Sequence, residues 1–246
     1  MSDVPKKKFK GSYYDAEYFA GEKGGKSYQT ADGTIKKWSY FNPTGEWAGC
    51  RDIVAAWKQM FTPDNLLDVG CGRGQIIAYA RDIGIKAEGF DFSEWAVSDE
   101  GRYSRCKNEW LKIHDATNPW PYEDNSYDLV TALDFYEHIY EEDLYFVIEE
   151  MFRVAKRHIF LLIATVDGIR ETGYILKKGN PIPWDDARTW AGHTTVQTPD
   201  FWYDRLERDD WFFMRGSAEH FYSLVDPNIT RNWVVNTIIV LEKFDE

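Results

Sequence analysis

The stretch "LLDVGCGRGQ", Leu66 to Gln75, decides how this chain folds. Its first four residues form a largely apolar run that is typical of a buried strand, and three glycines follow at alternate positions, Gly70, Gly72 and Gly74. A glycine-rich turn between a strand and a helix allows backbone N–H groups and the helix N-terminus to approach a ligand closely. The stretch therefore predicts a strand, a ligand-binding loop and a helix, in that order.

The spacing of these glycines distinguishes the loop from that of dinucleotide-binding enzymes. Their fingerprint is G-x-G-x-x-G, whereas here the third glycine, Gly74, comes one residue early and Gln75 occupies the fingerprint position. Asp68 also stands inside the strand that precedes the loop. A buried carboxylate is costly unless it meets a donor or a cation. The loop therefore favours a ligand that carries an ammonium group over a pyrophosphate.

Two further acids follow the next predicted strands. Asp91 ends the strand over residues 86–91, at a position where a carboxylate can accept both hydroxyls of a ribose. Asp115 follows the strand over residues 110–113, and its carboxylate could accept from the amino group of an adenine. The ligand inferred from these residues contains an amine, a ribose and an adenine, and it needs no phosphate.

Strands and helices alternate from Leu66 to Val166, which indicates an open, doubly wound α/β sheet. The expected strands cover residues 66–69, 86–91, 110–113, 127–133 and 158–166, and the expected helices include 141–154 and a short one capped by Ser93. A later helix begins at Thr198-Pro199 and runs to about Arg208. Residues 211–214 and 234–244 then predict two successive strands, normally antiparallel, with no helix between them.

The domain organisation follows from a change of pattern near Glu46. Residues 1–45 show little periodicity and predict an arm that could fold over a site as a lid. Residues 46–246 predict one domain, which suits a chain of 246 residues with a single large core. Within it, residues 167–197 are rich in Gly and Pro and predict an irregular insertion after the fifth strand, which we expect to cover an acceptor pocket.

Composition and charge restrict the partners. The net charge of −12 argues against nucleic-acid binding, which needs a basic surface, so we expect no DNA partner and disfavour RNA. Three cysteines without a CxxC pair indicate reduced thiols. The chain shows neither a secretory signal nor an apolar run long enough for a bilayer. We therefore expect a cytoplasmic protein with no membrane partner, and the oligomeric state stays open.

Four features together resemble the class I S-adenosylmethionine-dependent methyltransferases of the small-molecule type. They are "LLDVGCGRGQ", "AEGFDFSEWAV", "HDATNPWPYEDNSYDLVTALDFYEHI" and the final antiparallel pair of strands, and the resemblance covers roughly Glu46 to Glu246. It implies a Rossmann-like, doubly wound sheet of seven strands whose last strand inserts antiparallel. It also implies S-adenosylmethionine as the cofactor.

The resemblance further implies the residues that hold this cofactor. The loop would cradle the methionyl part, the acid after the second strand would hold the ribose, and the residues after the third strand would read the adenine edge. Residues just past the fourth strand would line the path to the methyl group. The implied cofactor residues are Asp68, Gly70, Cys71, Gly72, Gly74, Asp91, Phe92, Asp115, Ala116, Leu133 and Asp134.

The acceptor side is indicated by "YEHI", which places Glu137 and His138 beside the expected methyl group. Because the pKa of an unperturbed imidazole lies near neutrality, His138 is a candidate general base, and His193 in "AGHTTVQTP" is a second. The alternative for each is a structural histidine bonded to the backbone. We expect Tyr136 and Trp190 to line the acceptor pocket. No group of His and acidic residues has metal-ligand spacing, so we expect no metal.

The function that this sequence favours is methyl transfer to a hydroxyl or amine of a small molecule, such as a sugar or a natural product. Amino DNA methyltransferases carry an Asn- or Asp-Pro-Pro-aromatic motif after the fourth strand, where this chain has "LDFYEHI". Two alternatives stay open: a methyltransferase that acts on protein, or less favourably on RNA, and a non-catalytic subunit that binds the cofactor.

Overall fold

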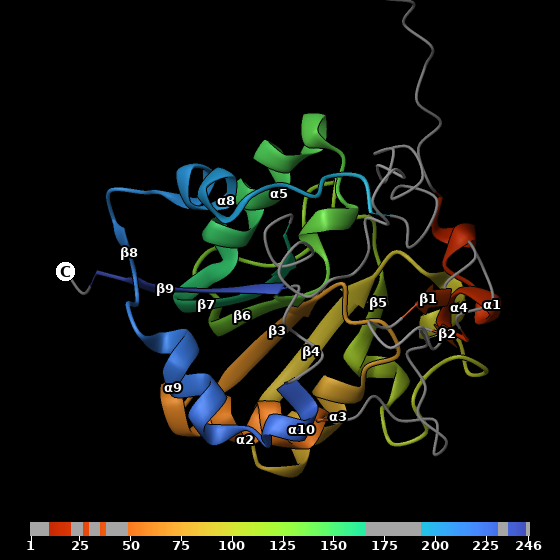
Figure 1. The fold of residues 1–246 in the computed structure, drawn as a ribbon. Coiled ribbons are helices and arrows are strands. Elements are labelled where there is room, and N and C mark those ends of the chain that lie inside the picture. The colour runs from red at the N-terminus through yellow and green to blue at the C-terminus, as the bar shows by residue number, and fades with distance from the viewer. Residues whose placement is uncertain are drawn as a thin grey trace, which may run out of the picture.

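The computed structural model describes residues 10–20, 27–29, 35–37, 49–165, 193–230 and 236–244. Within these residues seven strands form one sheet in the order β5-β4-β3-β6-β7-β9-β8 (Figure 1). The strands are β3 (Asn65–Val69), β4 (Lys86–Asp91), β5 (Leu111–Ile113), β6 (Tyr127–Leu133), β7 (Ala155–Ala164), β8 (Trp211–Phe213) and β9 (Asn236–Lys243). A separate antiparallel pair joins β1 (Ser27–Gln29) to β2 (Ile35–Lys37).

The direction of each strand follows from the connections. Strands β3 to β7 run parallel to one another. After each of them, a crossover connection brings the chain back to the end of the sheet at which the strands begin. The last strand, β9, lies between β7 and β8 and runs antiparallel to both. This topology confirms the predicted seven-stranded α/β sheet with an antiparallel last strand.

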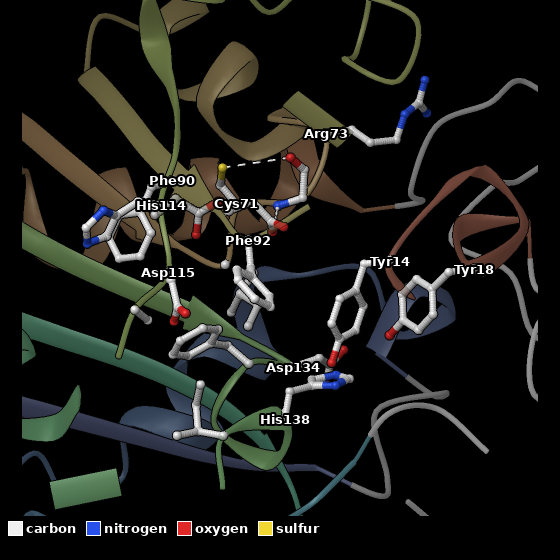
Figure 2. Close-up of a pocket in the computed structure, with 18 of the residues that line it drawn as sticks. Tyr14, Tyr18, Cys71, Arg73, Phe90, Phe92, His114, Asp115, Asp134 and His138 are labelled. Atoms are coloured by element: carbon white, nitrogen blue, oxygen red, sulfur yellow. Dashed lines mark hydrogen bonds between the residues drawn. The ribbon is translucent and has the colours of Figure 1, made fainter. Parts of the chain in front are cut away.

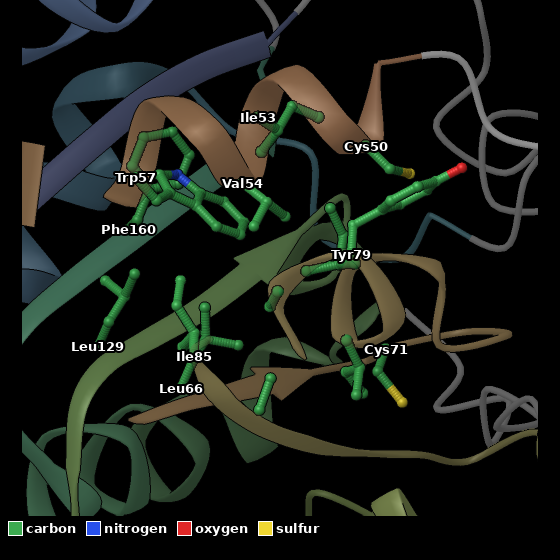
Figure 3. Packing of buried hydrophobic residues seen from close by; sticks show 14 of the residues in the cluster. Cys50, Ile53, Val54, Trp57, Leu66, Cys71, Tyr79, Ile85, Leu129 and Phe160 are labelled. Carbon is green, nitrogen blue, oxygen red and sulfur yellow. The ribbon is translucent and has the colours of Figure 1, made fainter. Parts of the chain in front are cut away.

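Helices cover both faces of the sheet, and the alternation of strand residues assigns a core to each face. On one face lie α2 (Cys50–Phe61), α3 (Gln75–Asp82) and α9 (Ser217–Leu224), and on the other lie α5 (Glu141–Val154) and α8 (Pro199–Leu206). Leu66 packs in the first core and its neighbour Leu67 in the second. In the first core, Trp57 of α2 contacts Phe160 of β7, with 5.2 Å between the ring centroids (Figure 3).

The connection between β8 and β9 differs from the expectation. The sequence predicted no helix there, but α9 and the short α10 (Pro227–Thr230) occupy it. The helical signal of α9 is weak, because within its eight residues only Ser217 and Phe221 are buried. Phe221 packs against Phe160, 4.9 Å between ring centroids, so this helix depends on a tertiary contact that a local pattern does not reveal.

Residues 10–20 of the predicted arm pack on the domain near the end of β4, where the hydroxyl of Ser93 donates to the carbonyl oxygen of Tyr14. A short turn, η1 (Gly11–Tyr13), precedes α1 (Ala16–Phe19), whose N-cap Asp15 accepts a hydrogen bond from the backbone N–H of Tyr18. The ring of Phe19 lies 5.3 Å from that of Trp95 in α4 (Glu94–Val97). Among the residues described, no helix is both long and apolar enough to cross a lipid bilayer.

Candidate active site

A cavity of about 240 Å³ opens at the carboxyl ends of β3, β4 and β6 (Figure 2). This edge is where parallel α/β sheets usually bind ligands. The predicted cofactor residues that line it are Asp68, Gly70, Cys71, Gly72, Asp91, Phe92, Asp115, Ala116, Leu133 and Asp134. Several other lining residues were not predicted as site residues, and six of them are aromatic: Tyr14, Tyr18, Phe19, Phe90, Phe135 and Tyr140. Ten predicted residues from four separate segments therefore meet at one cavity.

The glycines of the loop serve two different purposes. Gly72 has φ +52°, and a Cβ there would meet only Phe19, at 3.6 Å, so the missing side chain leaves space on the cavity side. Gly74, with φ +78°, does not line the cavity, which corrects the prediction for this residue. A Cβ at Gly74 would lie 2.6 Å from Cys106 Sγ, so close packing and a left-handed backbone require this glycine.

Asp68 is a buried acid that forms no ion pair with the residues that the structure describes. Its side chain is 3% exposed, and the hydroxyl of Thr131 on the neighbouring strand donates to Oδ1 at 2.8 Å. No cationic side chain in the described part of the chain forms an ion pair with it. Burial, with a smaller effect of the charge on Asp91, raises the pKa of Asp68 to about 7. A positively charged ligand in the cavity would stabilise the ionised carboxylate.

Asp91 connects the loop to the turn after β4. Its Oδ2 accepts from the backbone N–H of Gly72 and its Oδ1 from that of Ser93, each at 2.7 Å. Burial raises the pKa of Asp91, and these two hydrogen bonds oppose that rise. Each carboxylate oxygen has a second lone-pair site, so the acid can still accept ribose hydroxyls. The sequence predicted that Asp91 binds a ligand, but it did not predict the hydrogen bond from Gly72 by which Asp91 also fixes the loop.

Asp115 lies at the opposite end of the cavity from the arm, on the side of His114 in Figure 2. Its Oδ1 accepts from both the backbone N–H and the hydroxyl of Thr117, at 2.9 and 2.8 Å. This local turn fixes the carboxylate, because a side-chain acceptor bonded two residues ahead replaces a backbone turn. Ala116 next to it is buried and lines the cavity.

The two histidines predicted for the acceptor side lie together. His138 ends η4 (Tyr136–His138) and lines the cavity, where Figure 2 shows it below Tyr14. The ring of His193 stands edge-on to that of His138, with 4.7 Å between their centroids. The backbone N–H groups of Thr194 and Thr195 both donate to the carbonyl oxygen of Glu137, at 2.7 and 3.0 Å. These bonds hold the two segments side by side.

Tyr136 does not line the cavity, which corrects a predicted pocket residue. Its side chain is buried, its hydroxyl donates to the sulfur of Met151 at 3.0 Å, and its ring packs on Trp202. The tight turn of η4 directs Tyr136 into the core of the α5 face, while His138 faces the cavity. Trp190, the other predicted pocket residue, lies outside the described residues.

Asp134 and Glu137 form an acidic pair in the segment that ends at His138. Asp134 has φ +49°, which is unusual for a residue other than glycine, and Asn236 of β9 donates to its Oδ1. Burial raises the pKa of Asp134 above its ordinary value, and the hydrogen bond from Asn236 opposes that rise. Burial and the neighbouring Asp134 raise the pKa of Glu137 well above its ordinary value. Asn236 gave no signal in the sequence, because it comes from a strand 102 residues further along the chain than Asp134.

Two comparisons with known sequences agree with this geometry. Residues 67–163 match the family model described as a methyltransferase domain. Residues 67–163 therefore form a methyltransferase domain. Norajmaline N-methyltransferase of Rauvolfia serpentina is 33% identical over 98 residues, which is 38% of this chain and 32% of that protein. The match therefore spans about a third of the length of this curated relative.

Solved structures show the same fold at low sequence identity. The plantazolicin methyltransferase BpumL, in complex with a monoazolic desmethylPZN analog and SAH, superposes with a TM-score of 0.56 at 15% identity, covering 80% of this chain and 82% of BpumL. The mitomycin 7-O-methyltransferase MmcR gives a TM-score of 0.52 at 13% identity, covering 79% of this chain and 53% of MmcR. At these identities the likeness concerns the fold alone.

S-adenosylmethionine is the cofactor of this methyltransferase domain, and the cavity fits it. The cofactor carries an ammonium and a sulfonium cation, and Asp68 offers a buried carboxylate that forms no ion pair within the described residues. The open space at Gly72 admits a ligand directly against the backbone. The carboxylate of Asp68 and the open space beside Gly72 therefore suit the amino-acid part of the cofactor.

Proposed function

We propose that this chain transfers the methyl group of S-adenosylmethionine to a hydroxyl or amine of a small molecule. The observation that carries the proposal is that one cavity is lined both by Asp68 and the glycine loop that follows it and by His138. The name of one relative supports a small acceptor, because norajmaline N-methyltransferase is named for methylating a small molecule.

On the cofactor side, each residue has a task that follows from its contacts. Asp68 would pair with the ammonium group, and Asp91 would accept the ribose hydroxyls with the lone pairs that Gly72 and Ser93 leave available. Phe92 and Ala116 would flank the adenine ring, and Asp115 would accept from its amino group. When bound, S-adenosylmethionine supplies a methyl carbon made electrophilic by the sulfonium sulfur.

On the acceptor side, the protein positions the acceptor and receives its proton. Holding the acceptor atom in line with the methyl group converts a bimolecular step into one within a complex, which is a large part of such catalysis. A ring nitrogen of His138 or His193 can accept the proton of a hydroxyl. The predicted role of these histidines as general bases stays a prediction.

The arm would exclude water from this side of the cavity. Tyr14 lines the cavity and its ring centroid lies 5.8 Å from that of His138, while Tyr18 and Phe19 line it beside the loop. Burial raises the pKa of Tyr14, so its hydroxyl stays protonated and can donate a hydrogen bond to an acceptor. A dry cavity strengthens each electrostatic contact inside it. The lid function of residues 1–45 and the cytoplasmic location remain predictions.

A transfer assay with labelled cofactor tests the proposal. The protein is incubated with methyl-labelled S-adenosylmethionine and three cell fractions: small molecules, protein and RNA. We expect label in the small-molecule fraction, a loss of transfer in Asp68→Asn, and unchanged transfer in Asp99→Asn, a control acid whose side chain is 93% exposed. Label in protein or RNA would favour those acceptors instead. Cofactor binding without any transfer would indicate a non-catalytic subunit.

A further inference from the structure

A group of three side chains at the acceptor end has the composition of a metal site. Glu137, His138 and His193 each present a ligand atom, and these atoms lie within 4.8 Å of one another. We propose that this histidine corner, Glu137-His138-His193, binds one divalent cation of the first transition series. The sequence predicted no metal, because the third residue is distant along the chain and only the fold places it beside the other two.

The strongest indication is the carboxylate of Glu137, which is completely buried. Its Oε1 accepts a hydrogen bond from the backbone N–H of Ala164 at 3.3 Å. Its Oε2 is buried and accepts no hydrogen bond from an N–H or hydroxyl donor among the residues that the structure describes, and the side chain that interacts with Glu137 there is a second acid, Asp134. Leaving a buried carboxylate oxygen without a partner is costly, and a cation is the partner that offsets this cost most strongly.

The backbone around the corner is fixed in a way that suits ligands. Hydrogen bonds from Thr194 and Thr195 to the carbonyl of Glu137 hold the His193 segment against η4. His138 in turn donates its backbone N–H to the carbonyl of Phe135 at 2.9 Å. Metal–ligand distances of about 2.0–2.2 Å place ligand atoms up to about 4 Å apart. Small rotations of the two half-buried imidazoles would bring a separation of up to 4.8 Å into this range.

The donor set selects the kind of cation. Two imidazole nitrogens and one carboxylate oxygen suit Zn²⁺, Fe²⁺, Mn²⁺ or Co²⁺, whereas Ca²⁺ and Mg²⁺ prefer sites made of oxygen alone. Three protein ligands leave at least one coordination position open. Because His138 lines the cavity, a cation held by these residues would be accessible from the cavity.

The role that we assign to the cation rests on the proposed function, whereas its binding does not. The cation would hold the acceptor's oxygen and lower the pKa of its hydroxyl, which then loses its proton to water before the methyl group arrives. The two histidines would then act as ligands and not as general bases. The alternative occupant of the corner is a proton on Glu137, shared with the carboxylate of Asp134.

Titration with Co²⁺ alone tests the site. Protein without a polyhistidine tag is treated with EDTA, dialysed and titrated, and the visible absorption of bound Co²⁺ reports ligation by nitrogen and oxygen. We expect one Co²⁺ per chain, and binding at least about 100-fold weaker in His193→Gln and in Glu137→Gln. His220→Gln, a change of the same kind on α9, should leave binding unchanged.

Two outcomes overturn the proposal: no Co²⁺ binding by the wild-type chain, or equal binding by wild type and His193→Gln. The half-buried His193 keeps the test valid if Glu137→Gln fails to fold. Failure of the proposed function gives a different result. Co²⁺ binding without any methyl transfer would reject the function and keep the site, whereas transfer that continues in EDTA without Co²⁺ binding would reject the site and keep the function.

Discussion

Replacing Asp68 by Asn should stabilise the fold and weaken cofactor binding at the same time. Asn has nearly the same shape as Asp and can still accept the hydrogen bond from the hydroxyl of Thr131. The substitution therefore removes one negative charge from a side chain that is 3% exposed, and changes little else. A residue kept for packing would not show these two opposite effects.

The magnitude follows from the pKa of Asp68, which burial raises from 3.8 to about 7. Because the folded-state pKa lies above the unfolded one, the carboxyl contributes its full stability below about pH 4 and loses it as the pH rises through 7. A difference of about three pKa units at about 1.4 kcal/mol each amounts to about 4 kcal/mol. We expect Asp68→Asn to exceed wild type in free energy of unfolding by up to this amount at pH 8, and by almost nothing near pH 4.

Cofactor binding should change in the opposite direction. A hydrogen bond to a charged group contributes about 1.5–3 kcal/mol, so the loss of the carboxylate should weaken S-adenosylmethionine binding by about 2 kcal/mol, or ~30-fold. Wild-type affinity should also rise with pH through about 7, because the positive ligand favours ionised Asp68. The variant should lack this pH dependence.

Urea denaturation between pH 4 and pH 8 measures the stability difference, and titration calorimetry of S-adenosylmethionine at pH 6 and pH 8 measures the affinity. Asp99→Asn, an exposed acid in the turn that follows α4, is the control and should match wild type in both assays. A variant that is less stable than wild type at pH 8 would refute the assigned cost of the buried charge. Undiminished cofactor affinity would refute its pairing with the ligand.

Three further changes probe the rest of the site. Gly72→Val should abolish cofactor binding in calorimetry, because the side chain fills the cavity side of the loop, while Gly84→Val, with a similar φ but open space around it, should bind normally. Asp91→Ala should weaken binding by about 2 kcal/mol and lower the melting temperature, since it removes the acceptor of two backbone N–H groups. His138→Gln and His193→Gln should each lower kcat by ~10²–10⁴-fold at unchanged cofactor affinity, and near-full turnover in both would contradict a role in handling the proton.

The sequence by itself determined the sheet and one half of the site. Apolar runs and helical periodicity identified β3, β4, β6 and α5 with almost their observed bounds, because each of these signals is local. The acids Asp91 and Asp115 could be assigned to a ligand because the ends of parallel strands meet at one edge. Asp68 was identified by its chemistry, since a carboxylate inside a buried strand requires a partner.

Only the tertiary structure decided the acceptor end. A local pattern does not specify that Tyr136 turns into the core while His138 faces the cavity, because both lie in one tight turn. It does not show that α9 forms, since that helix depends on Phe221 packing against Phe160. The meeting of His193 with Glu137 and His138 arises from backbone hydrogen bonds between segments far apart in the chain. Side chains brought together by the closing of a fold leave no period or spacing in the sequence, which is why this half of the site could be found only in three dimensions.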